Sequence, residues 1–143
     1  MSRSTAREVA MMMIYSRMMG GEDTPAHVCE KAEDIAALSD EESAFAGELA
    51  EGALSHADEL DKRIGAHAIG WSLERIGRVD LSILRLAVYE MLYRDDVPVG
   101  AAINEAVELS KRFGQEKSPA FINGILGAIA REEDGADAEP HDE

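Results

Sequence analysis

The segment from residue 80 to residue 114 constrains the fold of this chain more than any other. Its first half has apolar residues at the spacing of one broad helix face: Ile83, Leu84, Ala87, Val88, Met91 and Leu92. Polar residues then interrupt the pattern, and Pro98 marks the start of a second helix whose apolar face includes Ile103 and Val107. Because only a few residues separate the two helices, we expect them to pack as an antiparallel pair at the centre of the core.

The rest of the chain also predicts helices. Gly20 and Gly21 end a first helix, and Thr24 begins a second that closes near Leu38. Ser39 begins a third through a capping box, and residues 55–68 either prolong it or form a new helix. Ser118 begins the last helix. With few aromatic residues among 45% hydrophobic residues, the composition favours an all-α fold. Trp71 is expected to fill a gap in the core.

Charge is distributed unevenly along the chain. Seven acidic residues and no basic ones follow Arg131, so the net charge of −15 leaves −8 for residues 1–131. We therefore expect one helical domain over 1–131 and an acidic disordered tail over 132–143. An acidic body argues against non-specific nucleic-acid binding, which depends on Lys and Arg at phosphates. It does not exclude a small basic site in the opening helix, where three arginines, Arg3, Arg7 and Arg17, outnumber the single acidic residue Glu8.

Several classes of protein are excluded by missing motifs. The sequence has no apolar run long enough for a membrane span and no secretory signal, so we expect a cytoplasmic protein. It has no glycine-rich phosphate loop, no Gly-x-Ser-x-Gly elbow and no Glu-x-x-His pair for a di-iron centre. Cys29 stands alone and is expected to be a small buried hydrophobe. These absences predict a binding protein without catalytic residues, metal or cofactor.

Three segments resemble the NusB family of transcription antitermination factors. They cover residues 79–92, 96–98 with 102–114, and 118–126, and include the runs Asp96-Val97-Pro98, Ala102-Ile103-Asn104-Glu105-Ala106 and Phe121-Ile122-Asn123-Gly124. The resemblance implies an all-α fold of about seven helices packed as two small bundles, without enzymatic activity. It also implies binding of the single-stranded boxA element of RNA together with the small-subunit ribosomal protein NusE. Such a pair supports RNA polymerase against termination, notably on ribosomal RNA operons.

The residues suggest how RNA could be bound. Arg3 and Arg7 are i, i+4 neighbours that could hold successive phosphates, and aromatic rings could stack on bases. The candidate RNA-binding residues are Arg3, Arg7, Tyr15, Lys111, Arg112, Phe121 and Asn123. Asp80 falls where the family pattern has an acidic residue that meets NusE, and a carboxylate there suits a basic ribosomal protein.

Each assignment has an alternative. Arg3 could be a solvated terminus, and Phe121 could belong to the core. Lys111 and Arg112 could serve only to stabilise the C-terminal end of a helix through its dipole. Many relatives have more arginines in the opening helix, so we expect RNA binding here to depend strongly on NusE. A protein-interaction adaptor with the same fold and little RNA affinity is the second hypothesis. A homodimer that covers the methionine-rich opening helix is a further prediction.

Overall fold

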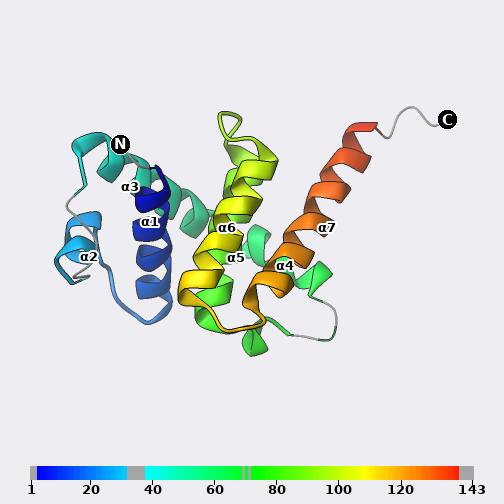
Figure 1. Cartoon of the computed structure of the whole chain (residues 1–143), viewed down its shortest axis with the longest axis horizontal. Helices are drawn as coiled ribbons and strands as arrows, with labels where there is room; N and C mark the ends of the chain where they lie inside the picture. Colours follow the sequence, from blue (N-terminus) through cyan, green and yellow to red (C-terminus); the bar gives the residue numbers. More distant parts are fainter. Residues whose placement is uncertain (1–2, 32–37, 69, 71, 139–143) are drawn as a thin grey trace.

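The chain folds into helices joined by short connections. The structure, a computed structural model, describes residues 3–31, 38–68, 70 and 72–138. Within these residues it contains no strand and has seven α-helices and one 3₁₀ turn (Figure 1): α1 (Arg3–Met18), α2 (Pro25–Lys31), α3 (Asp40–Ser55), α4 (Ala57–His67), η1 (Leu73–Arg75), α5 (Arg78–Tyr93), α6 (Val99–Phe113) and α7 (Ser118–Ala138). The all-α prediction is confirmed. Trp71 and the segment between Lys31 and Leu38 lie outside the described residues.

Helix α5 is the centre of the molecule. In Figure 1 helices α1 to α3 lie to the left of it, α4 and α7 lie to the right, and α6 overlaps it in the middle; α5 contacts α1, α3, α4, α6 and α7. Ile83, Leu84 and Val88 of its apolar face have no exposed surface. Helix α6 packs against both α5 and α7. The predicted central hairpin and the two-bundle arrangement are therefore confirmed.

Local sequence signals set the helix ends. The Glu42 amide donates to Ser39 Oγ at 3.1 Å, and the Ser39 amide donates to Glu42 Oε1 at 2.9 Å, which completes the predicted capping box. Thr24 Oγ1 caps α2 by accepting from the His27 amide. His56 separates α3 from α4, so residues after Ser55 form a new helix. Gly20 has a φ of +90°, a conformation that favours glycine where α1 ends.

One close approach fixes α3 against α5. The Tyr89 ring of α5 packs over Gly52 of α3, and a Cβ placed on Gly52 would lie 2.1 Å from Tyr89 Cζ. Any larger residue would have to displace the ring. The lack of a side chain at Gly52 thus allows α3 and α5 to approach each other closely at this point.

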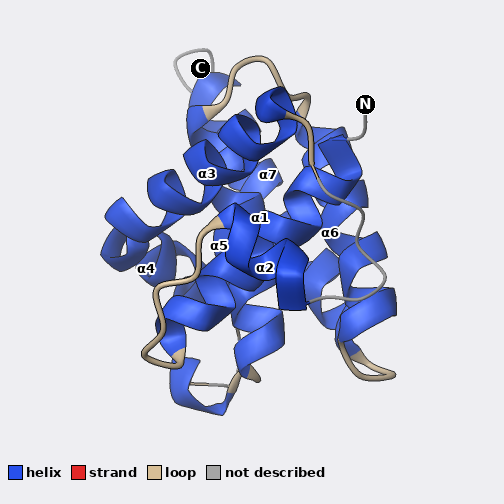
Figure 2. Ribbon diagram, turned by 90° about the vertical axis from the view of Figure 1, so that its left-hand side faces the viewer, coloured by secondary structure: helices blue, strands red, loops and turns tan. Residues whose placement is uncertain are grey.

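The methionine-rich helix α1 is covered mainly by the chain's own core. Met11 and Met13 are buried, and Met12 and Met18 pack against the core at half-buried positions. Helix α2 lies along α1 at the face nearest the viewer in Figure 2, which shows helices joined only by loops and by undescribed segments. Met19, just after the helix, is exposed. The homodimer considered from the sequence stays a prediction.

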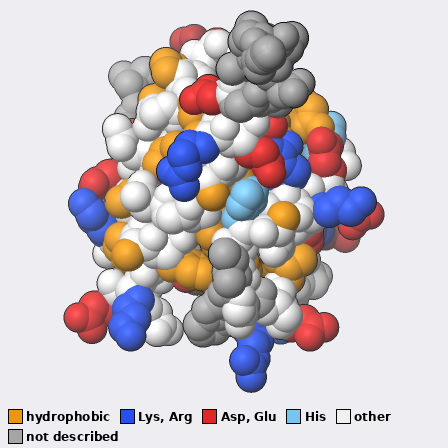
Figure 3. Space-filling model, turned by 90° about the vertical axis from the view of Figure 1, so that its right-hand side faces the viewer, with side chains coloured by type: hydrophobic (Ala, Val, Ile, Leu, Met, Phe, Trp, Pro, Cys, Tyr) orange, Lys and Arg blue, Asp and Glu red, His pale blue; other side chains and the backbone are white. Residues whose placement is uncertain are grey.

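Helix α7 extends beyond the boundary expected at residue 131. It continues to Ala138, whereas the sequence placed the start of a disordered tail at residue 132. Arg63 of α4 donates to Glu132 at 2.8 Å and to Glu133 at 2.7 Å, and His67 Nε2 lies 3.3 Å from Glu132. Figure 3 shows basic and acidic side chains side by side around a histidine on the face formed by this end of the molecule. These cross-helix pairs hold acidic residues in a helix that local composition alone does not favour.

Replacing Arg63 with alanine should loosen this helical extension. Hydrogen bonds from Arg63, and then from His67, hold the pKa of Glu132 below its ordinary value, so the carboxylate is charged at neutral pH. Without the guanidinium, amide protection from Glu132 to Ala138 should fall in hydrogen exchange, while protection in α5 stays unchanged. Lys62→Ala is the control, because Lys62 is exposed, lies next to Arg63 in the chain and has no ion pair among the described residues. Equal protection in both variants would show that the pairs do not order the helix.

Candidate nucleic-acid interface

The fold brings most of the predicted RNA-binding residues to one end of the molecule. Contacts from Ser4 to Glu105 and from Glu8 to Arg112 show that α1 and α6 run in the same direction. Their ends and the beginning of α7 therefore meet at the lower end in Figure 1. The predicted residues at this end are Tyr15, Lys111, Arg112, Phe121 and Asn123. Arg3 lies at the opposite end of α1.

Arg7 lies inside the protein. Its side chain is 8% exposed and that of Glu90 is 1% exposed. Arg7 Nε donates to both carboxylate oxygens of Glu90, at 3.0 and 2.9 Å. Burial raises the pKa of Glu90 above its ordinary value, while the hydrogen bond from Arg7 acts in the opposite direction. Arg7 thus joins α1 to α5, and its guanidinium is not presented to solvent beside that of Arg3.

Arg3 is accessible but has a carboxylate partner. Its side chain is 43% exposed, and Nη1 lies 3.5 Å from Asp96 Oδ2. Arg94 donates to both oxygens of Asp96, at 3.0 and 3.1 Å, and holds the pKa of Asp96 down at about 2. The guanidinium carbon of Arg3 lies 4.2 Å from the centre of the Phe45 ring. A carboxylate therefore already lies within ion-pair distance of the Arg3 guanidinium.

The cations at the end of α6 are also paired. Lys111 contacts Glu108 at 3.1 Å, and Arg112 contacts Glu8, whose side chain is buried. Both cationic side chains are exposed. They can approach a phosphate at this surface, but an acidic residue lies beside each of them.

The aromatic and amide candidates differ in exposure. Tyr15 is half-buried and lines a hollow between α1 and α2. Phe121 is half-buried and packs against the core, so it has both an internal and an accessible part. Asn123 is exposed, and the space around the neighbouring Gly124 is open. The first turns of α7 thus present an amide and accessible backbone.

The sequence analysis missed two cations at this end. Arg75 and Arg78 are exposed, and neither has a carboxylate within ion-pair distance in the part of the chain that the structure describes; Lys117 shares these properties. Arg78 Nη1 donates to the Met19 sulfur at 3.0 Å. Arg78 begins α5 and Lys117 directly precedes α7. The helix dipole disfavours a cation at the start of a helix, so the positions of Arg78 and Lys117 were the sequence signal that could have pointed to a binding role.

Asp80 links the starts of α5 and α7. Ser118 Oγ donates to Asp80 Oδ2 at 3.0 Å and accepts from the Gln115 amide at 2.9 Å. Burial raises the pKa of the half-buried Asp80 carboxyl above its ordinary value. Asp80 thus accepts a hydrogen bond within the protein, and part of the residue stays accessible to solvent. Whether it contacts NusE stays a prediction.

The fold and this surface define a class of protein. Among the described residues, no helix has the length and apolar character for crossing a membrane, and no group of His, Cys, Asp and Glu could hold a metal ion. What the structure presents is a surface of cations, rings and an amide at the meeting point of four helix ends. The molecule is a helical binding protein built around one central helix.

Comparison with known proteins identifies the family. The chain belongs to the NusB family, which it matches over residues 4–131. It is 47% identical over 132 residues to the transcription antitermination protein NusB of Geobacter sulfurreducens, covering 90% of this chain and 94% of that protein. NusB of T. maritima has a similar structure, with a TM-score of 0.79, 30% identity and 92% coverage of both chains. A structure of antitermination factors NusB and NusE in complex with dsRNA matches with a TM-score of 0.75, 28% identity and coverage of 91% and 96%.

Proposed function

We propose that this protein is a transcription antitermination factor that binds boxA-type single-stranded RNA together with the ribosomal protein NusE. The observation that most supports this function is that the end of α1 and the starts of α5 and α7 lie toward one end of the molecule. These segments contain Tyr15, Arg78, Lys117 and Asn123. Exposed cations without carboxylate partners suit phosphates, and rings and amides suit unpaired bases. The named relatives and the NusB–NusE complex with RNA support the same role.

The structure also gives a reason for dependence on NusE. Arg3, Lys111 and Arg112 each have an acidic neighbour, and Arg7 is buried. Few cations therefore remain for phosphates in the isolated protein. An adaptor with little RNA affinity is the less supported function, because the named relatives are antitermination proteins and a similar NusB–NusE structure contains RNA. No catalytic residue forms part of the proposal.

Fluorescence anisotropy with a boxA-type RNA and a scrambled RNA tests this function. Each is titrated with the protein alone and with equimolar NusE, at two salt concentrations. We expect selective binding of boxA that strengthens with NusE, with a salt slope that reports the number of phosphate contacts. Equal binding of both RNAs in every condition would exclude the antitermination role and favour the adaptor.

Asp96→Asn should strengthen RNA binding by about two- to threefold. The change removes the carboxylate from Arg3 and one negative charge from the surface, and exposed ion pairs contribute at most about 1 kcal/mol. Asp95→Asn makes the same change in charge at an exposed neighbour without an ion pair among the described residues. Anisotropy titrations of both variants measure the difference. Identical affinities would show that releasing Arg3 and Arg94 from Asp96 contributes nothing to RNA binding.

A further inference from the structure

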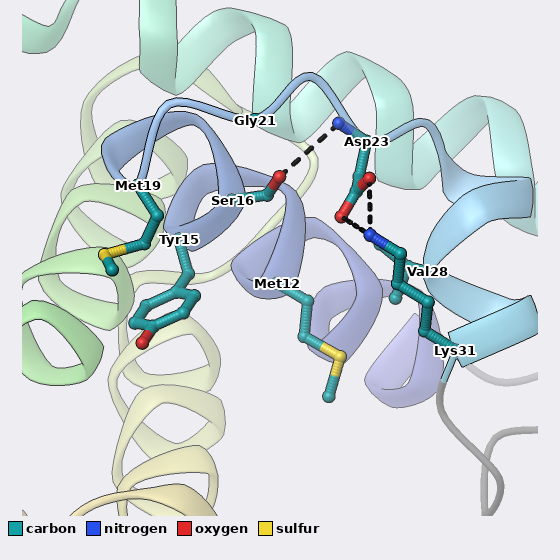
Figure 4. Close-up of a pocket in the computed structure, with 8 residues that line it drawn as sticks. All are labelled: Met12, Tyr15, Ser16, Met19, Gly21, Asp23, Val28 and Lys31. Carbon is teal, nitrogen blue, oxygen red and sulfur yellow. Dashed lines mark hydrogen bonds and ion pairs between the residues drawn. The ribbon is translucent and has the colours of Figure 1, made fainter.

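A hollow of about 420 Å³ lies between α1 and α2. Figure 4 shows its side chains, with Tyr15 and Met19 to one side of Met12 and the α2 residues Val28 and Lys31 to the other. Its volume falls in the range of about 300–1,000 Å³ that is typical of small-ligand sites. Of the residues predicted from the sequence to bind RNA, only Tyr15 lines this hollow.

The chemistry of the hollow suits a flat group with polar edges. Met12, Tyr15 and Val28 form an apolar surface, and a tyrosine ring can stack on a base. Lys31 Nζ donates to both Asp23 oxygens at 3.0 Å, and this hydrogen bond holds the pKa of Asp23 below its ordinary value. A charged carboxylate has about four acceptor positions, so Asp23 can still accept from an N–H group of a ligand.

A cation lies beside the hollow. Arg78 comes from α5, and its Nη1 donates to the sulfur of Met19, which lines the hollow. Within the described residues no carboxylate pairs with it. A thioether is a weak acceptor, so this guanidinium can exchange the contact for an anionic oxygen without separating an ion pair.

We propose that the hollow binds one nucleotide of single-stranded RNA, with the base against Tyr15 and the adjoining phosphate on Arg78. The proposal rests on the proposed function and adds to it a binding site on α2 and α5. Two features favour a nucleotide over an apolar segment of a protein. The Arg78 guanidinium, which has no carboxylate partner in the described part of the chain, complements a phosphate. Tyr15 belongs both to the hollow and to the predicted RNA-binding residues.

Arg78→Gln tests the phosphate contact. In anisotropy titrations with boxA-type RNA and NusE, its affinity should fall about fivefold near 0.1 M salt, and the salt slope should decrease by about one phosphate contact. Arg131→Gln is the matched control, because it removes the same charge from an exposed arginine in the second half of α7, with neither an ion pair nor a contact with the hollow among the described residues. Equal slopes and affinities for the two variants would overturn the phosphate assignment.

Methionine methyl spectra test the base position without a mutation. With ¹³C-methyl-methionine protein, boxA-type RNA should shift the Met12 and Met19 signals through the ring current of the base. Met91, which belongs to α5 and packs against the core outside the hollow, should not move. Unmoved Met12 and Met19 signals in a sample that binds RNA would overturn the base site and leave the proposed function intact. An absence of RNA binding by the unaltered protein with NusE would overturn both.

Discussion

Glu90→Ala is expected to lower the free energy of unfolding by about 3–5 kcal/mol. The carboxylate is 1% exposed and accepts two hydrogen bonds from Arg7 Nε, while Nη2 of Arg7 lies 2.9 Å from Glu90 Oε2. Removing it leaves a buried guanidinium whose remaining acidic neighbour, Glu105, is 4.0 Å away. The loss of stability therefore comes mainly from an uncompensated buried charge.

Urea unfolding followed by circular dichroism measures this effect. Glu108→Ala is the matched control, because it removes the exposed pair with Lys111 and should cost no more than about 1 kcal/mol. The double variant Arg7→Met with Glu90→Leu replaces both charges with apolar groups and should recover most of the lost stability. If Glu90→Ala and Glu108→Ala had equal effects, the pair would contribute no more than a surface ion pair.

Asp80→Asn should weaken NusE binding by about 2 kcal/mol, roughly thirtyfold in Kd, with little change in stability. The asparagine oxygen can still accept from Ser118, so the link between α5 and α7 remains while the negative charge is lost. Asp80→Ala would remove both the hydrogen bond and the charge. Comparing the two substitutions separates recognition of a basic partner from a structural role.

Isothermal titration calorimetry with NusE measures the affinity. Glu116→Gln, at an exposed acidic residue before α7 without an ion pair among the described residues, controls for net charge. Because burial raises the pKa of Asp80, this carboxyl binds a proton earlier on acidification than an ordinary aspartate, and binding by the unaltered protein should weaken with it. Asp80→Asn should lack this pH dependence. Unchanged NusE affinity in Asp80→Asn would exclude Asp80 from the interface.

Much of the fold could be predicted because its signals are local. The Ser39 capping box and the Thr24 cap act within one helical turn, and the apolar face of α5 repeats at helical spacing. Both kinds of pattern can be read without knowing any neighbour. The extent of α7 could not be predicted in this way, because Arg63 stabilises its acidic extension from α4.

The candidate site was only partly predictable. Tyr15 and Asn123, two of the predicted RNA-binding residues, lie toward the same end of the molecule, whereas Arg3 lies at the opposite end of α1. Arg78 was missed because its proposed role depends on its contact with Met19, 59 residues away in the chain, and on the lack of a carboxylate partner among the described residues. The hollow beside it requires α2 to lie along α1, which no spacing within either helix specifies.

The sequence by itself determined where most of the helices begin, that α5 is central, and which family the chain resembles. Only the tertiary structure decided which charges are available to a ligand. Arg3 and Arg7 are equivalent in helical spacing, yet Arg3 is exposed beside Asp96 and Arg7 is buried against Glu90. Helix formation depends on residues a few positions apart, whereas the burial and pairing of a charge depend on residues that packing brings from elsewhere in the chain.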